Sequence, residues 1–183
     1  MKLRSITVFL ILIIATSCNE KTALEKILNC SNSFSFSKTK EIKDVKKNFK
    51  IHVPTNWRTE LYYDELQSAV FTADTTKQLT EAFLLGTTWK NGELILDIAF
   101  EEKIKSNPEL IVIASQFENI HDKPAYWHHS KGMKNNFEYH LLDVYIKTSI
   151  DSYILISTQV YGKENINKRF CESMQLIKTL KII

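Results

Sequence analysis

Apolar and polar residues alternate along much of this chain, and the alternation predicts a β-rich domain. Phe49, Ile51 and Val53 are separated by polar residues, which is the pattern of a half-buried strand. Six further segments are predicted as strands: residues 66–74, 80–89, 110–120, 125–130, 136–148 and 153–161. Their short polar connections, including a break at residues 131–132, predict an antiparallel meander.

Three other segments have helical periodicity. A short helix is expected around residues 23–28, a second over residues 90–106 before Pro108, and a third from about Glu164. The apolar positions of the third helix repeat every three or four residues: Ile166, Phe170, Met174, Ile177 and Leu180. The chain is therefore expected to form an α+β domain with an antiparallel sheet of about six to seven strands flanked by helices.

The first residues have a different apolar pattern. An apolar stretch over residues 6–14 follows Lys2 and Arg4 and ends in small residues before Cys18. A basic start, a short apolar core and small residues at a cleavage point are typical of a secretory signal peptide. The apolar stretch is shorter than the roughly 20 residues that a membrane-spanning helix needs.

The end of this segment is Ala15-Thr16-Ser17-Cys18, which resembles a bacterial lipobox. The resemblance implies that Cys18 receives a diacylglycerol and becomes the first residue of a mature, membrane-anchored lipoprotein. In that export family an aspartate after the cysteine is linked to inner-membrane retention. Asn19 occupies that position here, so the outer membrane is favoured over the inner membrane.

Three parts of the chain are expected on this basis. Residues 1–17 are the signal peptide, residues 18–47 form a lipidated tether that contains a short helix, and residues 48–183 form one folded domain. Cleavage also removes two of the 24 basic residues and leaves 22 against 21 acidic ones, a net charge of +1. Because the remaining lysines are interspersed with acids, no nucleic-acid partner is expected.

Cys30 and Cys171 remain once Cys18 is lipidated. The envelope permits disulfides, and a bond between these two cysteines would join the start of the domain to its last helix. Two separate buried thiols are the alternative, because free cysteine packs as a small apolar residue. The sequence leaves both possibilities open.

Candidate catalytic and metal-binding groups do not form a recognisable site. His121, His128, His129 and His140 lie close in sequence, but adjacent strand residues point to opposite faces, and their spacing is not that of a zinc site. No nucleophile motif or phosphate-binding glycine loop is present in the sequence. We therefore expect no metal, no cofactor and no enzymatic activity.

The aromatic residues are the more promising group for binding. Tyrosine and tryptophan combine an apolar body with a polar tip and are favoured at interfaces, although most strand aromatics belong to cores. The predicted binding face consists of five residues: Trp57, Tyr62, Tyr63, Trp127 and His129.

Three short motifs resemble the PsbP-like family, named for an extrinsic subunit of photosystem II. They are an opening strand and turn at residues 49–57, a tight turn into a strand at residues 122–126, and a terminal helix ending at residues 177–180. The likeness covers residues 48–183. Asn56 is a departure, since the family often has glycine there. The family also includes a Ran-binding nuclear import factor and bacterial lipoproteins, and has no common catalytic residues.

Two functions are consistent with these features. The resemblance and the anchor favour a non-enzymatic envelope lipoprotein that binds a protein or other envelope partner. The alternative is an envelope enzyme that binds a small molecule or a metal, which would need convergent polar groups in a deep pocket. A shallow aromatic patch would support the first function, and a pocket with two or more histidines would support the second.

Overall fold

A seven-stranded antiparallel sheet is the main element of the computed structural model, which describes residues 21–31, 35–134 and 136–183. The predicted signal peptide and Cys18 lie outside these residues. The strands follow one another across the sheet in this order: β3 (Arg58–Tyr63), β4 (Gln67–Ala73), β5 (Leu84–Asn91), β9 (Ser152–Tyr161), β8 (Phe137–Lys147), β7 (Lys123–Lys134) and β6 (Leu110–Ile120).

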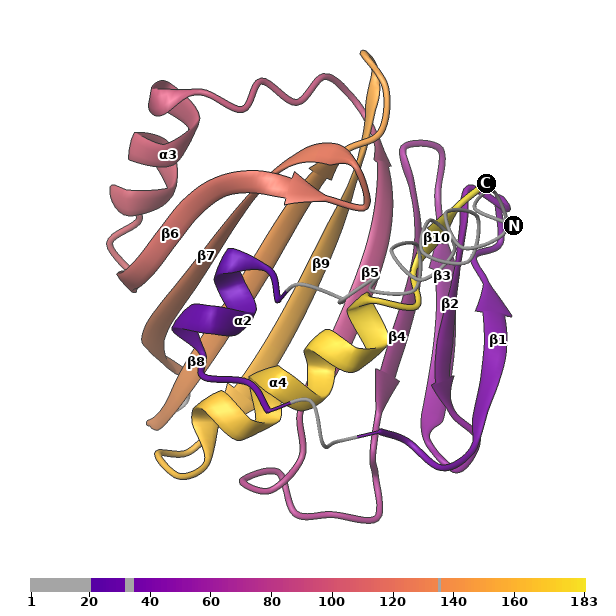
Figure 1. Cartoon of the computed structure of the whole chain (residues 1–183), viewed down its shortest axis with the longest axis vertical. Helices are drawn as coiled ribbons and strands as arrows, with labels where there is room; N and C mark the ends of the chain where they lie inside the picture. Colours follow the sequence, from indigo (N-terminus) through magenta and orange to yellow (C-terminus); the bar gives the residue numbers. More distant parts are fainter. Residues whose placement is uncertain (1–20, 32–34, 135) are drawn as a thin grey trace, which may run out of the picture.

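A smaller sheet and three helices complete the described fold (Figure 1). The smaller sheet has the antiparallel order β1 (Thr39–Lys43), β2 (Phe49–Pro54) and β10 (Lys181–Ile182). The helices are α2 (Ala23–Ile27), α3 (Ile98–Lys105) and α4 (Ile166–Ile177). The prediction of a mostly antiparallel α+β fold is confirmed, although the strands divide between two sheets.

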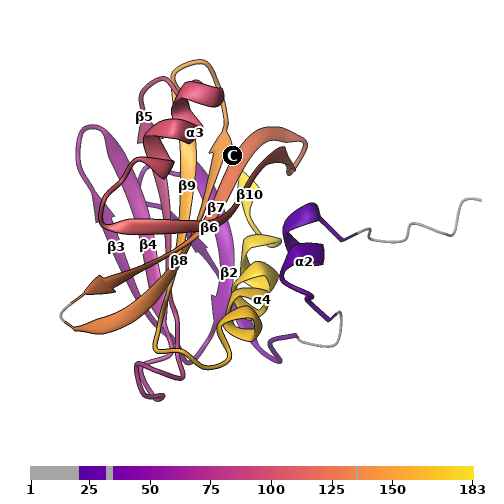
Figure 2. The ribbon, with the colours of Figure 1, turned by 90° about the vertical axis from the view of Figure 1, so that its left-hand side faces the viewer.

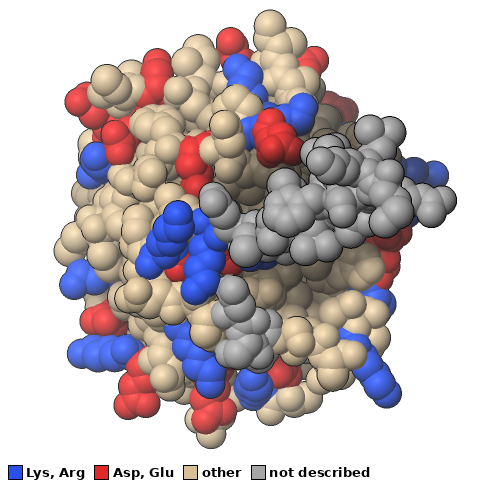
Figure 3. All heavy atoms as spheres, in the orientation of Figure 1, with Lys and Arg blue, Asp and Glu red and all other residues tan. Residues whose placement is uncertain are grey.

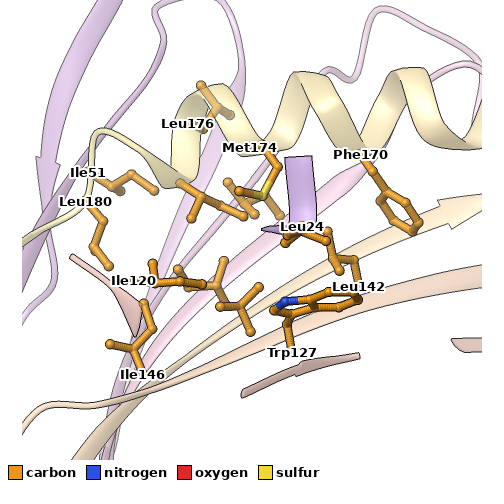
Figure 4. Packing of buried hydrophobic residues seen from close by; sticks show 14 of the residues in the cluster. Leu24, Ile51, Ile120, Trp127, Leu142, Ile146, Phe170, Met174, Leu176 and Leu180 are labelled. Atoms are coloured by element: carbon orange, nitrogen blue, oxygen red, sulfur yellow. The ribbon is translucent and has the colours of Figure 1, made fainter. Parts of the chain in front are cut away.

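The core lies between one face of the large sheet and α4. Residues of β9 alternate between buried and partly exposed along its whole length, which is the pattern expected of a strand with one face in the core. Trp127 and Leu142 of the sheet lie beneath Phe170 and Met174 of α4 (Figure 4), and all four are 2% exposed or less. This face of the sheet is called the core face below.

The helices cover the two faces of the large sheet unequally. Both α2 and α4 lie on the core face, where Figures 1 and 2 show them side by side. Helix α3 contacts the opposite face at one end only, through Phe100 against Tyr126 and Tyr145. The prediction of flanking helices therefore holds in part, because most of the opposite face has no helix on it in the described chain.

The described part of residues 18–47 belongs to the folded body instead of forming a separate tether. Helix α2 begins with a capping box between Thr22 and Glu25, and its Leu24 is fully buried in the core. A disulfide joins Cys30 to Cys171 of α4 across 141 residues. Strand β1 then pairs along its whole length with β2.

Several element boundaries differ from the prediction, among them β5, which starts at Leu84 and not at residue 80, and two of the differences have identifiable reasons. The helix expected over residues 90–106 starts only at Ile98, where Asp97 accepts a hydrogen bond from the Phe100 amide. The break expected at residues 131–132 is absent, because β7 continues through Gly132 to Lys134. A Cβ atom at Gly132 would lie 2.7 Å from the Glu109 carbonyl oxygen, so this glycine permits close backbone approach within a strand.

Candidate binding surface on the open sheet face

The strand registers define which side chains share the face opposite the core. One continuous row crosses all seven strands: Tyr62, Ala69, Thr88, Leu155, Tyr145, Tyr126 and Phe117. Paired residues in an antiparallel sheet point to the same side, so the whole row lies on this face. The row is mostly aromatic or aliphatic even though it faces away from the core.

The neighbouring rows are mixed: single apolar residues such as Phe71 and Leu84 lie beside polar ones such as Glu60 and Gln159. We use the name open face for seven aromatic or aliphatic residues on this side of β3, β4, β5, β8 and β9: Tyr62, Phe71, Leu84, Tyr139, Tyr153, Leu155 and Tyr161. Tyr62, Phe71 and Leu84 are 48%, 39% and 36% exposed, and the other four are partly exposed. Clustered apolar exposure of this kind marks interaction sites on soluble proteins.

Phe71 lies directly over a glycine on the neighbouring strand β5. It pairs with Gly86 of β5, and a Cβ atom at Gly86 would come within 3.0 Å of the Phe71 ring. The glycine therefore provides the space in which an aromatic ring lies flat against the sheet. This arrangement holds Phe71 in a defined position on the open face.

Helix α3 closes one end of this face. Its Phe100 ring packs edge-on against Tyr126 at 5.4 Å and against Tyr145 at 5.1 Å between centroids. On the same helix, Glu101 accepts a hydrogen bond from Ser115 of β6 at 2.7 Å and pairs with Lys105 at 2.9 Å. These contacts fix α3 and leave the open face bounded by a helix on one side.

A buried polar cluster adjoins the covered end. His128 Nδ1 lies 2.8 Å from Ser130 Oγ, and His128 Nε2 lies 3.6 Å from Asp143 Oδ2. His128, Ser130 and Asp143 are 2%, 0% and 8% exposed. Three residues of the types used in serine hydrolases thus lie together on this face.

Burial determines the protonation of this cluster. It raises the pKa of Asp143 to about 6, an effect that the Ser157 hydroxyl and Lys90 partly offset. It also lowers the pKa of His128 to about 4. Asp143 is therefore ionised and His128 neutral at neutral pH, without a charged partner for the carboxylate within the cluster. Within the described residues, Asp143 Oδ1 is buried and has no hydrogen-bond partner.

The same burial argues against nucleophilic catalysis at this cluster. Ser130 has no exposed surface, so an acyl group has no approach to its hydroxyl oxygen. The His128 ring is likewise covered, and it stacks beside Tyr145. The cluster is a buried polar group at the covered end of this sheet face.

The fold of this chain is similar to that of proteins with solved structures, although its sequence is not similar to that of any known family. No family model matches the sequence, and no curated protein shows significant similarity to it. CyanoP, the cyanobacterial PsbP of Synechocystis sp. PCC 6803, superposes with a TM-score of 0.58 at 10% identity, over 84% of this chain and 97% of its own. The fold is PsbP-like.

Two further structures have the same PsbP-like architecture. A protein of Bacteroides thetaiotaomicron VPI-5482 matches 79% of this chain with a TM-score of 0.52 at 11% identity, and this chain spans about half (48%) of it. The Saccharomyces cerevisiae Ran-binding protein Mog1p has a TM-score of 0.50 at 8% identity, over 79% of this chain and 95% of its own. At these identities the likeness concerns the fold alone.

The PsbP-like fold separates the five residues of the predicted binding face. Trp57, Trp127 and His129 are 6%, 0% and 8% exposed and belong to the core side. Only Tyr62 and Tyr63, at 48% and 61%, are available to a partner, and they lie on opposite faces of β3. The grouping was therefore wrong for three residues, because both tryptophans fill the interior.

Specific contacts hold these three residues in place. Trp57 packs edge-on against Phe36 and Phe83. His129 Nε2 lies 3.0 Å from His140 Nδ1, and its ring meets that of Phe170 edge-on. Burial lowers the pKa of His129 to about 4.

The histidines do not converge on a metal site in the described residues. His128 and His129 point to opposite faces of β7, as the sequence predicted, and His121 lies in the turn before β7. Across residues 21–31, 35–134 and 136–183, no group of three histidine, cysteine or acidic side chains is placed to hold a metal ion.

The sequence contained a signal for the open face that the aromatic count missed. In β9, Tyr153, Leu155 and Tyr161 occupy the positions that an amphipathic strand gives to polar residues. A strand with apolar residues at both alternating sets of positions has two apolar faces. In β4, Phe71 likewise lies on the side opposite the buried Val70. The burial of Asp143 had no such signal in the sequence, because it depends on three-dimensional packing.

The surface has mixed charge, and the helices are short. Acidic and basic side chains are interspersed on the surface seen in Figure 3, without a single-sign patch. None of the helices in the described part of the chain has both the length and the apolar character needed to cross a membrane.

Proposed function

We propose that this chain is a non-enzymatic, lipid-anchored accessory protein of the bacterial cell envelope, and that it binds a protein partner on the open face. The observation that supports the proposal is the open face itself: aromatic and aliphatic residues on a sheet face that α3 covers at one end only. A flat surface with aromatic residues suits a folded protein surface better than a small molecule, which binds in a concave pocket.

The proposed anchor would orient this face. Cys18 is three residues before Lys21, so the lipid attachment point lies within about 11 Å of the first described residue. Helix α2 follows at once on the core side of the sheet, where the Ala23 amide donates to Glu118 of β6. The bilayer would therefore lie on the side of α2, and the open face would point away from it.

The buried polar cluster supports a binding role over a catalytic one. Its serine and histidine are shielded, and the β7–β8 register places all three residues on one face of the sheet. We infer that it stiffens one end of the open face. A surface that is rigid before binding loses less conformational entropy when a partner docks.

Substitution of Phe71 tests the proposal. Phe71→Ser should reduce capture of the partner by cross-linked immunoprecipitation from intact cells by about 10-fold or more, which is the loss expected for a central aromatic contact. Ile150→Ser is the matched control, because Ile150 is 78% exposed in the β8–β9 turn, outside the open face. Equal losses in both variants, or no loss with Phe71→Ser, would contradict the proposed surface.

A further inference from the structure

The outer edge of β3 carries unpaired backbone groups. β3 pairs only with β4 in the described chain, and the Asp64 amide donates to the Gln67 carbonyl oxygen at the hairpin end. Because hydrogen-bonded pairs alternate along an antiparallel ladder, Tyr62 and Glu60 bond towards β4. The N–H and C=O groups of Thr59, Leu61 and Tyr63 then point away from the sheet.

This edge is exposed and has a defined shape. Leu61 and Tyr63 are 51% and 61% exposed. Asp64 accepts hydrogen bonds from the Leu66 and Gln67 amides and from the Tyr62 hydroxyl, which fixes the turn. An exposed, regular edge with apolar residues is a template for pairing with another strand.

The residue order on β3 favours a second copy of the same strand. If two β3 edges pair antiparallel about a twofold axis at Leu61, that residue faces its own symmetry mate. Thr59 then faces Tyr63, and each matched pair exchanges two hydrogen bonds through the free backbone groups. Arg58 of each copy lies opposite Asp64 of the other, so opposite charges meet at both ends.

Other registers lack this complementarity. Sliding the second strand by two residues in one direction places Glu60 opposite Glu60. Sliding it by two in the other direction places Glu60 opposite Asp64. Like charges directly opposite one another destabilise a strand pair. The register centred on Leu61 uses the whole strand and avoids both repulsions.

We propose that two copies of this chain associate through antiparallel β3–β3 pairing centred on Leu61. The two seven-stranded sheets then become one continuous sheet. A twofold axis perpendicular to this sheet keeps both α2 helices on one side and both open faces on the other. If the anchor exists as proposed above, both lipids face the same bilayer; the pairing itself does not depend on the anchor or on the open face.

Cysteine cross-linking in cells tests this pairing with the full-length protein. In a hydrogen-bonded antiparallel pair the Cα atoms lie about 5.5 Å apart, within disulfide range, so Leu61→Cys should give a disulfide-linked dimer on non-reducing gels. We expect about tenfold more dimer from Leu61→Cys than from Tyr62→Cys, which would face Glu60, or from Ile150→Cys. Wild-type protein controls for Cys18.

A charge variant checks the register. In the Leu61→Cys background, Arg58→Glu places like charges opposite one another and should lower the dimer fraction several-fold, whereas Arg58→Lys should keep it. Equal cross-linking at Leu61, Tyr62 and Ile150 would indicate random collision and overturn the proposal, as would no dimer from folded Leu61→Cys protein. Loss of partner capture with Phe71→Ser leaves this result unaffected, so the two proposals fail separately.

Discussion

Asp143→Asn tests the electrostatics of the buried cluster. Burial raises the pKa of this carboxyl from 3.8 to about 6, and each pKa unit corresponds to about 1.4 kcal/mol. The native state therefore binds a proton more tightly than the unfolded state. Tighter proton binding by Asp143 stabilises the native state fully below pH 3.8, and this stabilisation is lost as the pH rises through 6. At pH 7.5 the ionised carboxylate costs at most about 3 kcal/mol, and asparagine removes this cost.

The expected result is a pH-dependent stabilisation. Urea denaturation of the mature chain carrying Cys18→Ser should show Asp143→Asn to be about 1–3 kcal/mol more stable than its parent at pH 7.5. The difference should shrink as the pH falls from 7 towards 4, because the parent then takes up its proton. Asp122→Asn, at an exposed turn, is the matched control and should change stability by less than about 0.5 kcal/mol.

A different charge state would give the opposite sign. If His128 were protonated and paired with an ionised Asp143, removing the carboxylate would leave an unpaired buried cation. Loss of one partner of a buried pair costs about 3–5 kcal/mol. A strong destabilisation by Asp143→Asn at pH 7.5, or a stabilisation that does not vary with pH, would contradict an ionised, unpaired Asp143 in the native state.

Two further predictions concern the N-terminal region. Cys30→Ser with Cys171→Ser should lower the free energy of unfolding by about 5 kcal/mol, since the bond closes a loop across 141 residues. Two alkylatable thiols in the folded, non-reduced wild-type chain would contradict the bond. Cys18→Ala should abolish incorporation of a fatty-acid probe during metabolic labelling, because the thiol is the proposed attachment point. Equal labelling of variant and wild type would exclude the lipobox interpretation.

Local pattern was sufficient to predict much of the sheet. Strand β2 was predicted almost to the residue because its alternation is regular, and β6 because an apolar run begins after Pro108 and turn residues follow Ile120. Strands β1 and β3 were missed for the opposite reason. Most residues of β1 and β3 are exposed, so their sequences show little apolar alternation. These two segments are strands because they pair with β2 and β4. Propensity alone does not reveal such tertiary pairing.

The candidate site was harder to predict than the fold. Tyr62 was identified as a surface aromatic, but Trp127 was placed with it although it is fully buried. A tryptophan on a strand has the same local sequence signature whether it faces the core or a partner. The open face became visible only when the register placed Phe71, Leu84 and Leu155 on one side of the sheet.

Site-specific photocross-linking in intact cells is the strongest test of whether the open face binds a protein partner. A photoreactive phenylalanine analogue at Phe71 reports on any protein that contacts the open face, and the same analogue at Ile150 reports on a surface outside it. We expect a discrete cross-linked band that contains a second protein from position 71 and is absent from position 150. No adduct from position 71 in correctly localised protein, or the same adducts from both positions, would contradict binding at the open face.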